Sequence, residues 1–139
     1  MTIQDIQHEI VDEFSMFDDW MQRYEYIIEL GKTLPIIDER YKVDENIIKG
    51  CQSKVWVHGE EQDGKIVFTA DSDAILTKGI IAVLIRAFSN QTPSSILEAN
   101  TDFIDEIGLK EHLSPTRANG LVSMIKQIKM YALAFQAKQ

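Results

Sequence analysis

The 139-residue chain is poor in several residue types, and each shortage excludes a class of protein. It has a single cysteine, Cys51, so it forms no internal disulfide and cannot build a metal cage from thiolates alone. Glycine and proline are scarce, and no segment is of low complexity or resembles a flexible linker. No apolar run approaches the roughly 20 residues of a membrane span. The first residues lack the basic and apolar regions of a signal peptide.

Basic residues are also few, at 14 Lys and Arg against 22 Asp and Glu, which gives a net charge of −8. Such an acidic chain is poorly suited to gripping a phosphate backbone, so we expect no nucleic-acid partner. The length fits one domain, and 45% hydrophobic with 26% charged residues is ordinary for a soluble globular protein. We therefore expect one cytoplasmic domain over residues 1–139, without membrane attachment and with a reduced thiol.

A β-hairpin is the clearest local signal. Asp63-Gly64 is a favoured two-residue turn between the apolar runs 55–57 and 66–68. Counting outwards from this turn pairs Val57 with Ala70 and Val55 with Ser72. Strand alternation then predicts a buried face made of Val55, Val57, Ile66, Phe68 and Ala70. Residues 56, 58, 67 and 69 are expected on the opposite face.

Helical patterns flank this hairpin. Apolar residues recur at helical spacing in 3–14 and 20–31, with Gly31 as the expected residue after the second helix. Residues 74–88 are apolar almost all round and predict a central buried helix, preceded by the capping run 71–73. Gly79 within it predicts a close approach by another element. The last helix follows Ser114-Pro115, and Thr92-Pro93 starts a shorter one. Together these elements predict a single α+β domain in which a short antiparallel sheet packs against several helices.

The lone cysteine lies between a turn and a strand. An isolated cysteine is most often a small buried hydrophobe. Here a glycine precedes Cys51 and three polar residues follow it, and the irregular segment 38–49 comes before, so we expect a thiol carried on a loop. His58 could pair with this thiol as a base, although a histidine on the wetter face of a strand is the favoured interpretation. His8, His58 and His112 are scattered without zinc-ligand spacing, and no glycine-rich phosphate loop is present.

Four motifs in the chain resemble those of the SufE family of sulfur acceptors, which includes the CsdE proteins. The first is residues 50–56, Gly-Cys-Gln-Ser-Lys-Val-Trp. The others are residues 20–35, residues 71–74 with 78–83, and residues 112–117 with 120, 121 and 124. Ser114 and Thr116 stand where the family pattern has Thr and Ser. Residues before about 18 carry no distinctive match.

This resemblance implies a fold that is similar overall to U-type cluster scaffolds, and a role in iron–sulfur cluster assembly. Cys51 would accept persulfide sulfur from a cysteine desulfurase of the SufS or CsdA type, stimulate that enzyme, and pass sulfur to a scaffold complex of the SufBCD type. The desulfurase uses pyridoxal phosphate, whereas the SufE-like protein needs no cofactor or metal of its own and is an accessory protein. Arg117 would steady the thiolate or a partner carboxylate, or would be an ordinary first-turn helix residue.

Four further residues are expected to support the loop. Gln52 and Ser53 would shape it through side-chain hydrogen bonds, and Asp71 with Asp73 would either order it or cap the central helix. The absence of a second cysteine is consistent with a carrier, because a resolving thiol would displace the bound sulfur.

Two other functions remain open on the sequence alone. An iron–sulfur scaffold would need about four ligands, which one cysteine per chain does not supply even in a dimer. An independent cysteine-dependent enzyme would need His58 or His112 beside Cys51. The identity of the desulfurase, the oligomeric state, with a homodimer among the options, and any shelter of Cys51 by Trp56 and the central helix are left open.

Overall fold

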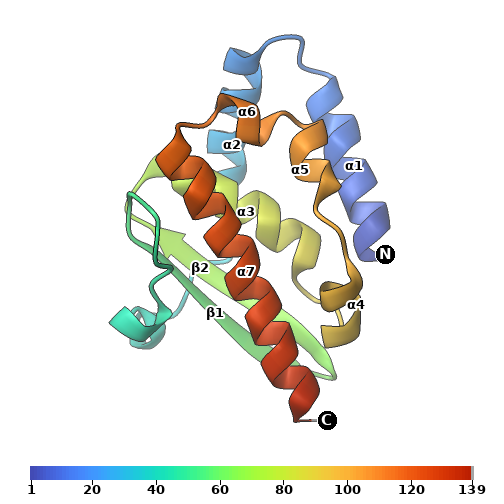
Figure 1. Ribbon diagram of the computed structural model, residues 1–139, viewed down its shortest axis with the longest axis vertical. Coiled ribbons are helices and arrows are strands. Elements are labelled where there is room, and N and C mark those ends of the chain that lie inside the picture. The colour runs from blue at the N-terminus through green and yellow to red at the C-terminus, as the bar shows by residue number, and fades with distance from the viewer. Residues whose placement is uncertain (139) are drawn as a thin grey trace.

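A computed structural model describes residues 1–138 of the chain (Figure 1). Within them, seven α-helices and one two-stranded antiparallel sheet form an α+β fold, as predicted. The elements are α1 (Ile3–Ser15), α2 (Trp20–Gly31), β1 (Val55–Gln62), β2 (Lys65–Ser72), α3 (Ile75–Phe88), α4 (Pro93–Glu98), α5 (Asp102–Glu106), α6 (Leu109–His112) and α7 (Pro115–Ala137). Two 3-10 turns, η1 (Glu39–Tyr41) and η2 (Asp44–Asn46), lie in the segment between α2 and β1. No helix among the described residues is long and apolar enough to cross a membrane.

The hairpin has the predicted register. Val57 pairs with Ala70 and Val55 pairs with Ser72. Asp63 and Gly64 both have positive φ, 54° and 80°, as a type I′ turn requires. All five residues of the predicted inner face are completely buried. The hairpin prediction is therefore confirmed. It could be made from the sequence because the turn and the alternation are both encoded locally.

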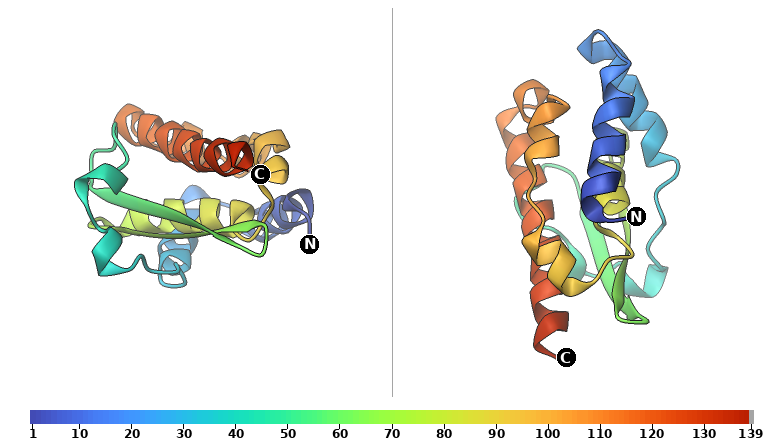
Figure 2. Two further views of the ribbon diagram at one scale, coloured as in Figure 1. Left: turned by 90° about the horizontal axis from the view of Figure 1, so that it is seen from below. Right: turned by 90° about the vertical axis from the view of Figure 1, so that its right-hand side faces the viewer.

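The elements are arranged in layers (Figure 2). Helix α7 runs along the hairpin and, together with α4, α5 and α6, covers one side of α3. Helix α2 packs on α3 from the other side. The segment between α2 and β1 covers the outer face of the hairpin, where Tyr41 stacks on His58 and Lys42 lies over the Trp56 ring. Both faces of the short sheet are thus covered, which a two-stranded ribbon needs for stability.

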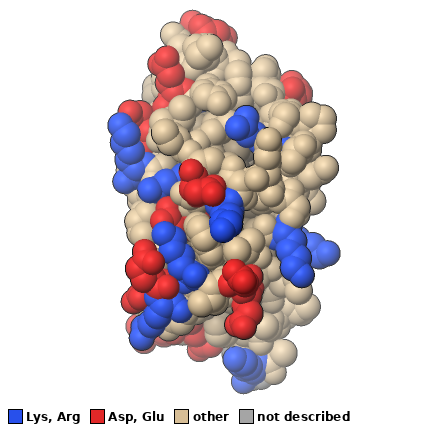
Figure 3. All heavy atoms as spheres, turned by 90° about the vertical axis from the view of Figure 1, so that its left-hand side faces the viewer, with Lys and Arg blue, Asp and Glu red and all other residues tan. Residues whose placement is uncertain are grey.

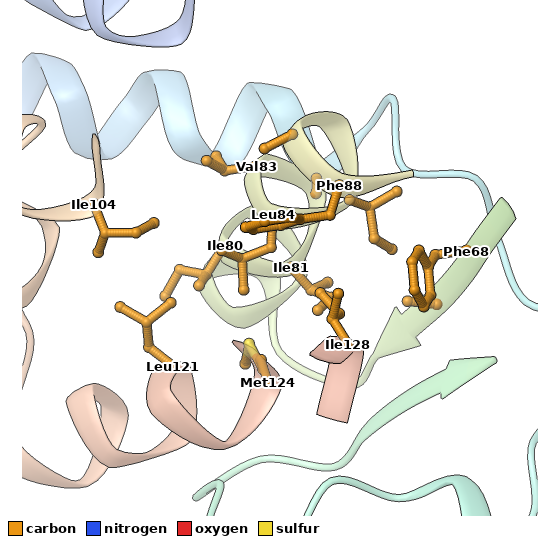
Figure 4. Packing of buried hydrophobic residues seen from close by; sticks show 14 of the residues in the cluster. Phe68, Ile80, Ile81, Val83, Leu84, Phe88, Ile104, Leu121, Met124 and Ile128 are labelled. Atoms are coloured by element: carbon orange, nitrogen blue, oxygen red, sulfur yellow. The ribbon is translucent and has the colours of Figure 1, made fainter. Parts of the chain in front are cut away.

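Helix α3 lies at the centre of the hydrophobic core (Figure 4). Eleven of its residues are buried, and they face side chains from β2, α5 and α7. Gly79 faces α2, where an added Cβ would lie 2.7 Å from Ile27 Cγ2 and would also overlap the Ile27 carbonyl. The predicted close approach at Gly79 is confirmed. Gly31 takes part in the same crossing: its own Cβ would lie 3.0 Å from the Gly79 nitrogen.

Two predictions about helix ends are wrong in detail. Gly31 is the last residue of α2, and Lys32 follows it in an ordinary right-handed conformation, so Gly31 serves helix packing and not a left-handed cap. The run 71–73 does not cap α3 with its side chains either. Strand β2 continues to Ser72, and Ala74 is the N-cap residue without a side-chain hydrogen bond. The carboxylates of Asp71 and Asp73 instead bind groups distant in the sequence, as described below.

Candidate functional site around Cys51

Three segments that are far apart in the sequence meet at Cys51. The loop 50–54 brings the thiol to the end of the hairpin, where the first turns of α3 and α7 also lie (Figure 1). Gly50, directly before the cysteine, has φ of +90°, a conformation that other residues rarely adopt. The predicted loop position of the thiol is confirmed, and the side chain is partly buried.

The thiol lies at a cavity of about 10 Å³. Such a volume corresponds to about one water-sized sphere. The cavity is lined by Cys51, Gln52, Thr77, Ile80, Arg117, Gly120 and Met124. Trp56 is not among these residues; α7 supplies the shelter together with α3. A larger hollow of about 570 Å³ beside Phe17 and Tyr26 lies elsewhere on the surface and is lined by no cysteine.

Helix α7 approaches the thiol through a glycine. Cys51 Sγ lies 3.8 Å from the Gly120 carbonyl oxygen, within reach of a weak S–H donor. A Cβ on Gly120 would lie 3.0 Å from Sγ and 3.4 Å from the Cys51 Cα. The absence of a side chain at Gly120 is therefore what lets the loop rest against the helix.

Burial also controls the reactivity of the thiol. Loss of hydration raises the pKa of the Cys51 thiol above its ordinary value, because the thiolate would be charged in partly apolar surroundings. This shift favours the protonated thiol. Since the thiolate is the nucleophile, the resting loop holds Cys51 in a weakly reactive state.

The start of α7 positions Arg117. The Ser114 hydroxyl accepts the Arg117 backbone N–H (3.3 Å), and Pro115 occupies the first helical turn, as predicted. The Arg117 side chain reaches the Cys51 cavity, three residues before Gly120 on the same face of the helix. Its Nε is buried and has no hydrogen-bond partner among residues 1–138. Its charge at this cavity is therefore not compensated by any described carboxylate.

The end of the loop is fastened to the strand–helix connection. The Lys54 N–H donates to Asp73 Oδ1 (3.0 Å), and the Asp73 N–H donates to the Lys54 carbonyl (3.2 Å). The Ser72 hydroxyl donates to the same carbonyl (2.8 Å). Asp71 lies close by but binds Lys42 (2.9 Å) and Lys78 (3.6 Å) instead. These partners explain why the run does not cap α3.

The remaining predicted residues divide between cavity and surface. Gln52 lines the cavity, and Ser53 follows it in the bend of the loop. Neither the Gln52 nor the Ser53 side chain forms a hydrogen bond within residues 1–138, so the side-chain hydrogen bonds predicted for the loop are not observed there. His58 stacks on Tyr41 and His112 stacks on Trp20, and neither histidine lines the Cys51 cavity.

No group of three or more His, Cys, Asp or Glu side chains within residues 1–138 is arranged to hold a metal ion.

The sequence interpretation missed the role of Gly120. The signal was available: residues 117, 120 and 124 share one helix face, and a glycine on such a face indicates a close contact.

These features define a class of protein: a small α+β domain that presents one sheltered cysteine on a loop. The model of the SufE family, described as an Fe-S metabolism associated domain, matches residues 8–132. An uncharacterized SufE-like protein of Rhizobium meliloti is 42% identical over 89% of this chain and 92% of its own length. A SufE-like protein of Synechocystis is 39% identical over 94% of this chain and 82% of its own. The chain therefore belongs to the SufE family.

Two further relatives extend the comparison. SufE-like protein 1 of Arabidopsis thaliana, named as chloroplastic/mitochondrial, is 37% identical over 94% of this chain, which corresponds to 35% of the plant protein. The solution structure of a hypothetical protein from Thermus thermophilus has a TM-score of 0.77 and covers 93% of this chain and 94% of its own. Its 19% identity makes it evidence for the fold alone.

Proposed function

We propose that this protein is a sulfur acceptor and carrier of iron–sulfur cluster assembly, with Cys51 as the acceptor. Membership of a family associated with Fe-S metabolism supports the pathway. The observation that carries the proposal is the position of the chain's one thiol, on a loop end beside a cavity with room for about one further atom. The sulfur comes from a cysteine desulfurase of the SufS or CsdA type and passes to a scaffold complex of the SufBCD type in the cytoplasm.

The transfer is a thiol exchange without net oxidation. The Cys51 thiolate attacks the terminal sulfur of the desulfurase persulfide and forms a new S–S bond. The S–S bond within the donor persulfide breaks, and the donor cysteine leaves as a thiolate. Removal of the persulfide frees the desulfurase for its next turnover, which is how the acceptor stimulates it.

Both properties of the site support a carrier. The small cavity shields the added sulfur from water, oxidants and reducing thiols, and the chain has no second cysteine that could displace it. Burial raises the pKa of the thiol, which lowers the thiolate fraction and slows attack on other partners while the loop is closed. Transfer therefore requires the loop to open when the desulfurase binds.

The test is intact-protein mass spectrometry after incubation with a SufS-type desulfurase and free cysteine, without reductant. We expect the mass of one or more sulfur atoms on Cys51, removed by dithiothreitol. The variant Cys51→Ser is expected to fold normally, to gain no sulfur and to give no stimulation. Full stimulation by Cys51→Ser, or a wild-type protein that gains no sulfur from an active desulfurase, would refute the proposal.

A further inference from the structure

Four cations lie around the Cys51 loop without a carboxylate partner. Lys49 and Lys54 flank the cysteine in sequence, Arg117 lines its cavity, and Lys126 is on the next face of α7. We call these four residues the basic ring. None of them takes part in an ion pair or donates a side-chain hydrogen bond within residues 1–138, and the three lysines are exposed.

Two residues of the basic ring line a surface hollow beside the Cys51 loop. Lys49 and Lys126 line a hollow of about 310 Å³ together with Ser123. Ser123 Oγ would lie 3.1 Å from a Cβ on Gly50, the residue before Cys51, so the hollow borders the loop directly. Glu45 is the one carboxylate in its lining. Figure 3 shows the side of the molecule on which the Cys51 loop lies, with Lys and Arg groups spread across it and acidic groups between them.

This cluster contrasts with the charge of the rest of the chain. The protein carries a net charge of −8, and residues 1–31, which form α1 and α2, hold eight carboxylates and one basic residue. Several basic side chains outside the ring have carboxylate partners: Lys42 and Lys78 bind Asp71, and Arg86 binds Glu13. Four of the eight Lys and Arg side chains that form no ion pair within residues 1–138 thus lie where the thiol must meet its donor, on a chain whose net charge repels acidic surfaces.

Burial outweighs the cations at the resting thiol. Burial accounts for the raised pKa of Cys51, and no neighbouring cation reverses it. Exposed lysines that neither pair internally nor stabilise the thiolate are available to an approaching macromolecule.

We propose that the basic ring docks an acidic surface surrounding the donor persulfide of the desulfurase, and so brings that persulfide to Cys51. The inference rests on the proposed function and adds the chemistry of the partner. Long-range attraction of this kind accelerates encounter and orients the partner, and it weakens as salt screens the charges over distances of about 10 Å at 0.1 M. The acidic surface of α1 and α2 repels such a partner and so disfavours docking in other orientations.

The test compares charge-reversal variants with a matched control. Lys49→Glu/Lys126→Glu changes the ring, and Lys65→Glu/Lys138→Glu makes the same change of net charge at exposed lysines without ion pairs, at the hairpin turn and at the end of α7. The measurement is the concentration of each protein that half-saturates stimulation of a purified SufS-type desulfurase, at about 50 mM and about 500 mM salt. Alkylation of Cys51 by the neutral reagent iodoacetamide checks that the loop itself is unchanged.

We expect the ring variant to need about tenfold more protein for half-saturation at low salt, and the control variant to stay within about twofold of wild type. The difference should largely disappear at high salt. Equal half-saturation by both variants at low salt, with wild-type Cys51 still gaining sulfur, would overturn the basic-ring proposal and leave the sulfur-acceptor function standing. A wild-type protein that gains no sulfur from the active enzyme would remove both.

Discussion

Replacement of Gly120 by alanine tests whether the thiol is held in its cavity by close packing against α7. The added methyl carbon would lie 3.0 Å from Cys51 Sγ, which is shorter than the roughly 3.5–4.0 Å of a favourable contact between heavy atoms. The helix itself tolerates the change, because Gly120 lies within α7 and has no positive φ. The loop must therefore move, and it can do so towards solvent, because Gly50, Gln52 and Lys54 are exposed.

Two terms matter here. The cost of overpacking decides the balance between the closed and the open loop, and the gain in helix propensity enters only the free energy of global unfolding. Overpacking costs about 1–3 kcal/mol, and a surface loop that can yield places the cost at the lower end, about 1–2 kcal/mol, which falls on the closed loop alone. Alanine also favours the helix over glycine by about 1 kcal/mol, in the closed and the open state alike. We expect the open state to gain about 1–2 kcal/mol over the closed state, or roughly a 5- to 30-fold increase in its population. The free energy of global unfolding should change by less than about 1 kcal/mol.

The rate of Cys51 alkylation by iodoacetamide measures this population. Gly120→Ala should react about 5- to 30-fold faster than wild type at the same pH. Its persulfide should also be lost faster to dithiothreitol. Asn119→Ala is the matched control, because it raises helix propensity at an exposed neighbour that does not touch the cavity. An unchanged alkylation rate in a folded Gly120→Ala protein would refute the close packing of the thiol on the helix.

Three other predictions follow from the remaining geometry. Gly79→Ala should destabilise the protein by about 3 kcal/mol and lower the thermal midpoint by about 10 °C, because the methyl group would overlap Ile27 in α2; an unchanged midpoint would mean that the two helices are not in contact there. The hydrogen bond from Arg86 holds the pKa of Glu13 below its ordinary value of 4.5, so its stabilisation is present above that pH and is lost as pH falls through the lower folded value; denaturant titrations between about pH 5 and pH 3 should show a shallower loss of stability for Glu13→Gln than for wild type. Because burial raises the thiol pKa, the rate of Cys51 alkylation should rise with pH and reach its midpoint above 9.0, and a midpoint below that value would contradict the sheltered site.

The fold could be predicted from the sequence where the signal is local. The turn at Asp63-Gly64 and the alternation on either side of it determine the hairpin register without reference to the rest of the chain. The continuous apolar pattern of α3 likewise indicates burial on all sides. Gly79 indicated a close contact, but the partner helix could not be named from the sequence, since that depends on how distant segments pack.

The site shows the limit of such reasoning. The run 71–73 has the composition of a helix cap, yet Asp71 binds lysines from two other segments and Asp73 holds the end of the Cys51 loop. A carboxylate next to a helix start can serve either purpose, and the choice depends on partners distant in the sequence. Gly120 is similar: its glycine character is visible in the sequence, whereas the thiol that it accommodates lies 69 residues away.

In the proposed function, the closed loop protects the bound sulfur and the basic ring recognises the sulfur donor. The proposed carrier role requires that reactive sulfur is not lost to solvent thiols, and Cys51 rests against Gly120 with the pKa of its thiol raised by burial. The same shelter makes spontaneous attack on a donor slow, because little thiolate is present and the cavity restricts approach. Under the proposed function, loop opening is therefore coupled to binding of the desulfurase. Attachments that a partner can compete for lie at the end of the loop, where two backbone groups of Lys54 bind Asp73 and Ser72 at the surface. An acidic partner drawn to the lysine side chains would engage this same connection, so that recognition and release of the thiol would occur at one place.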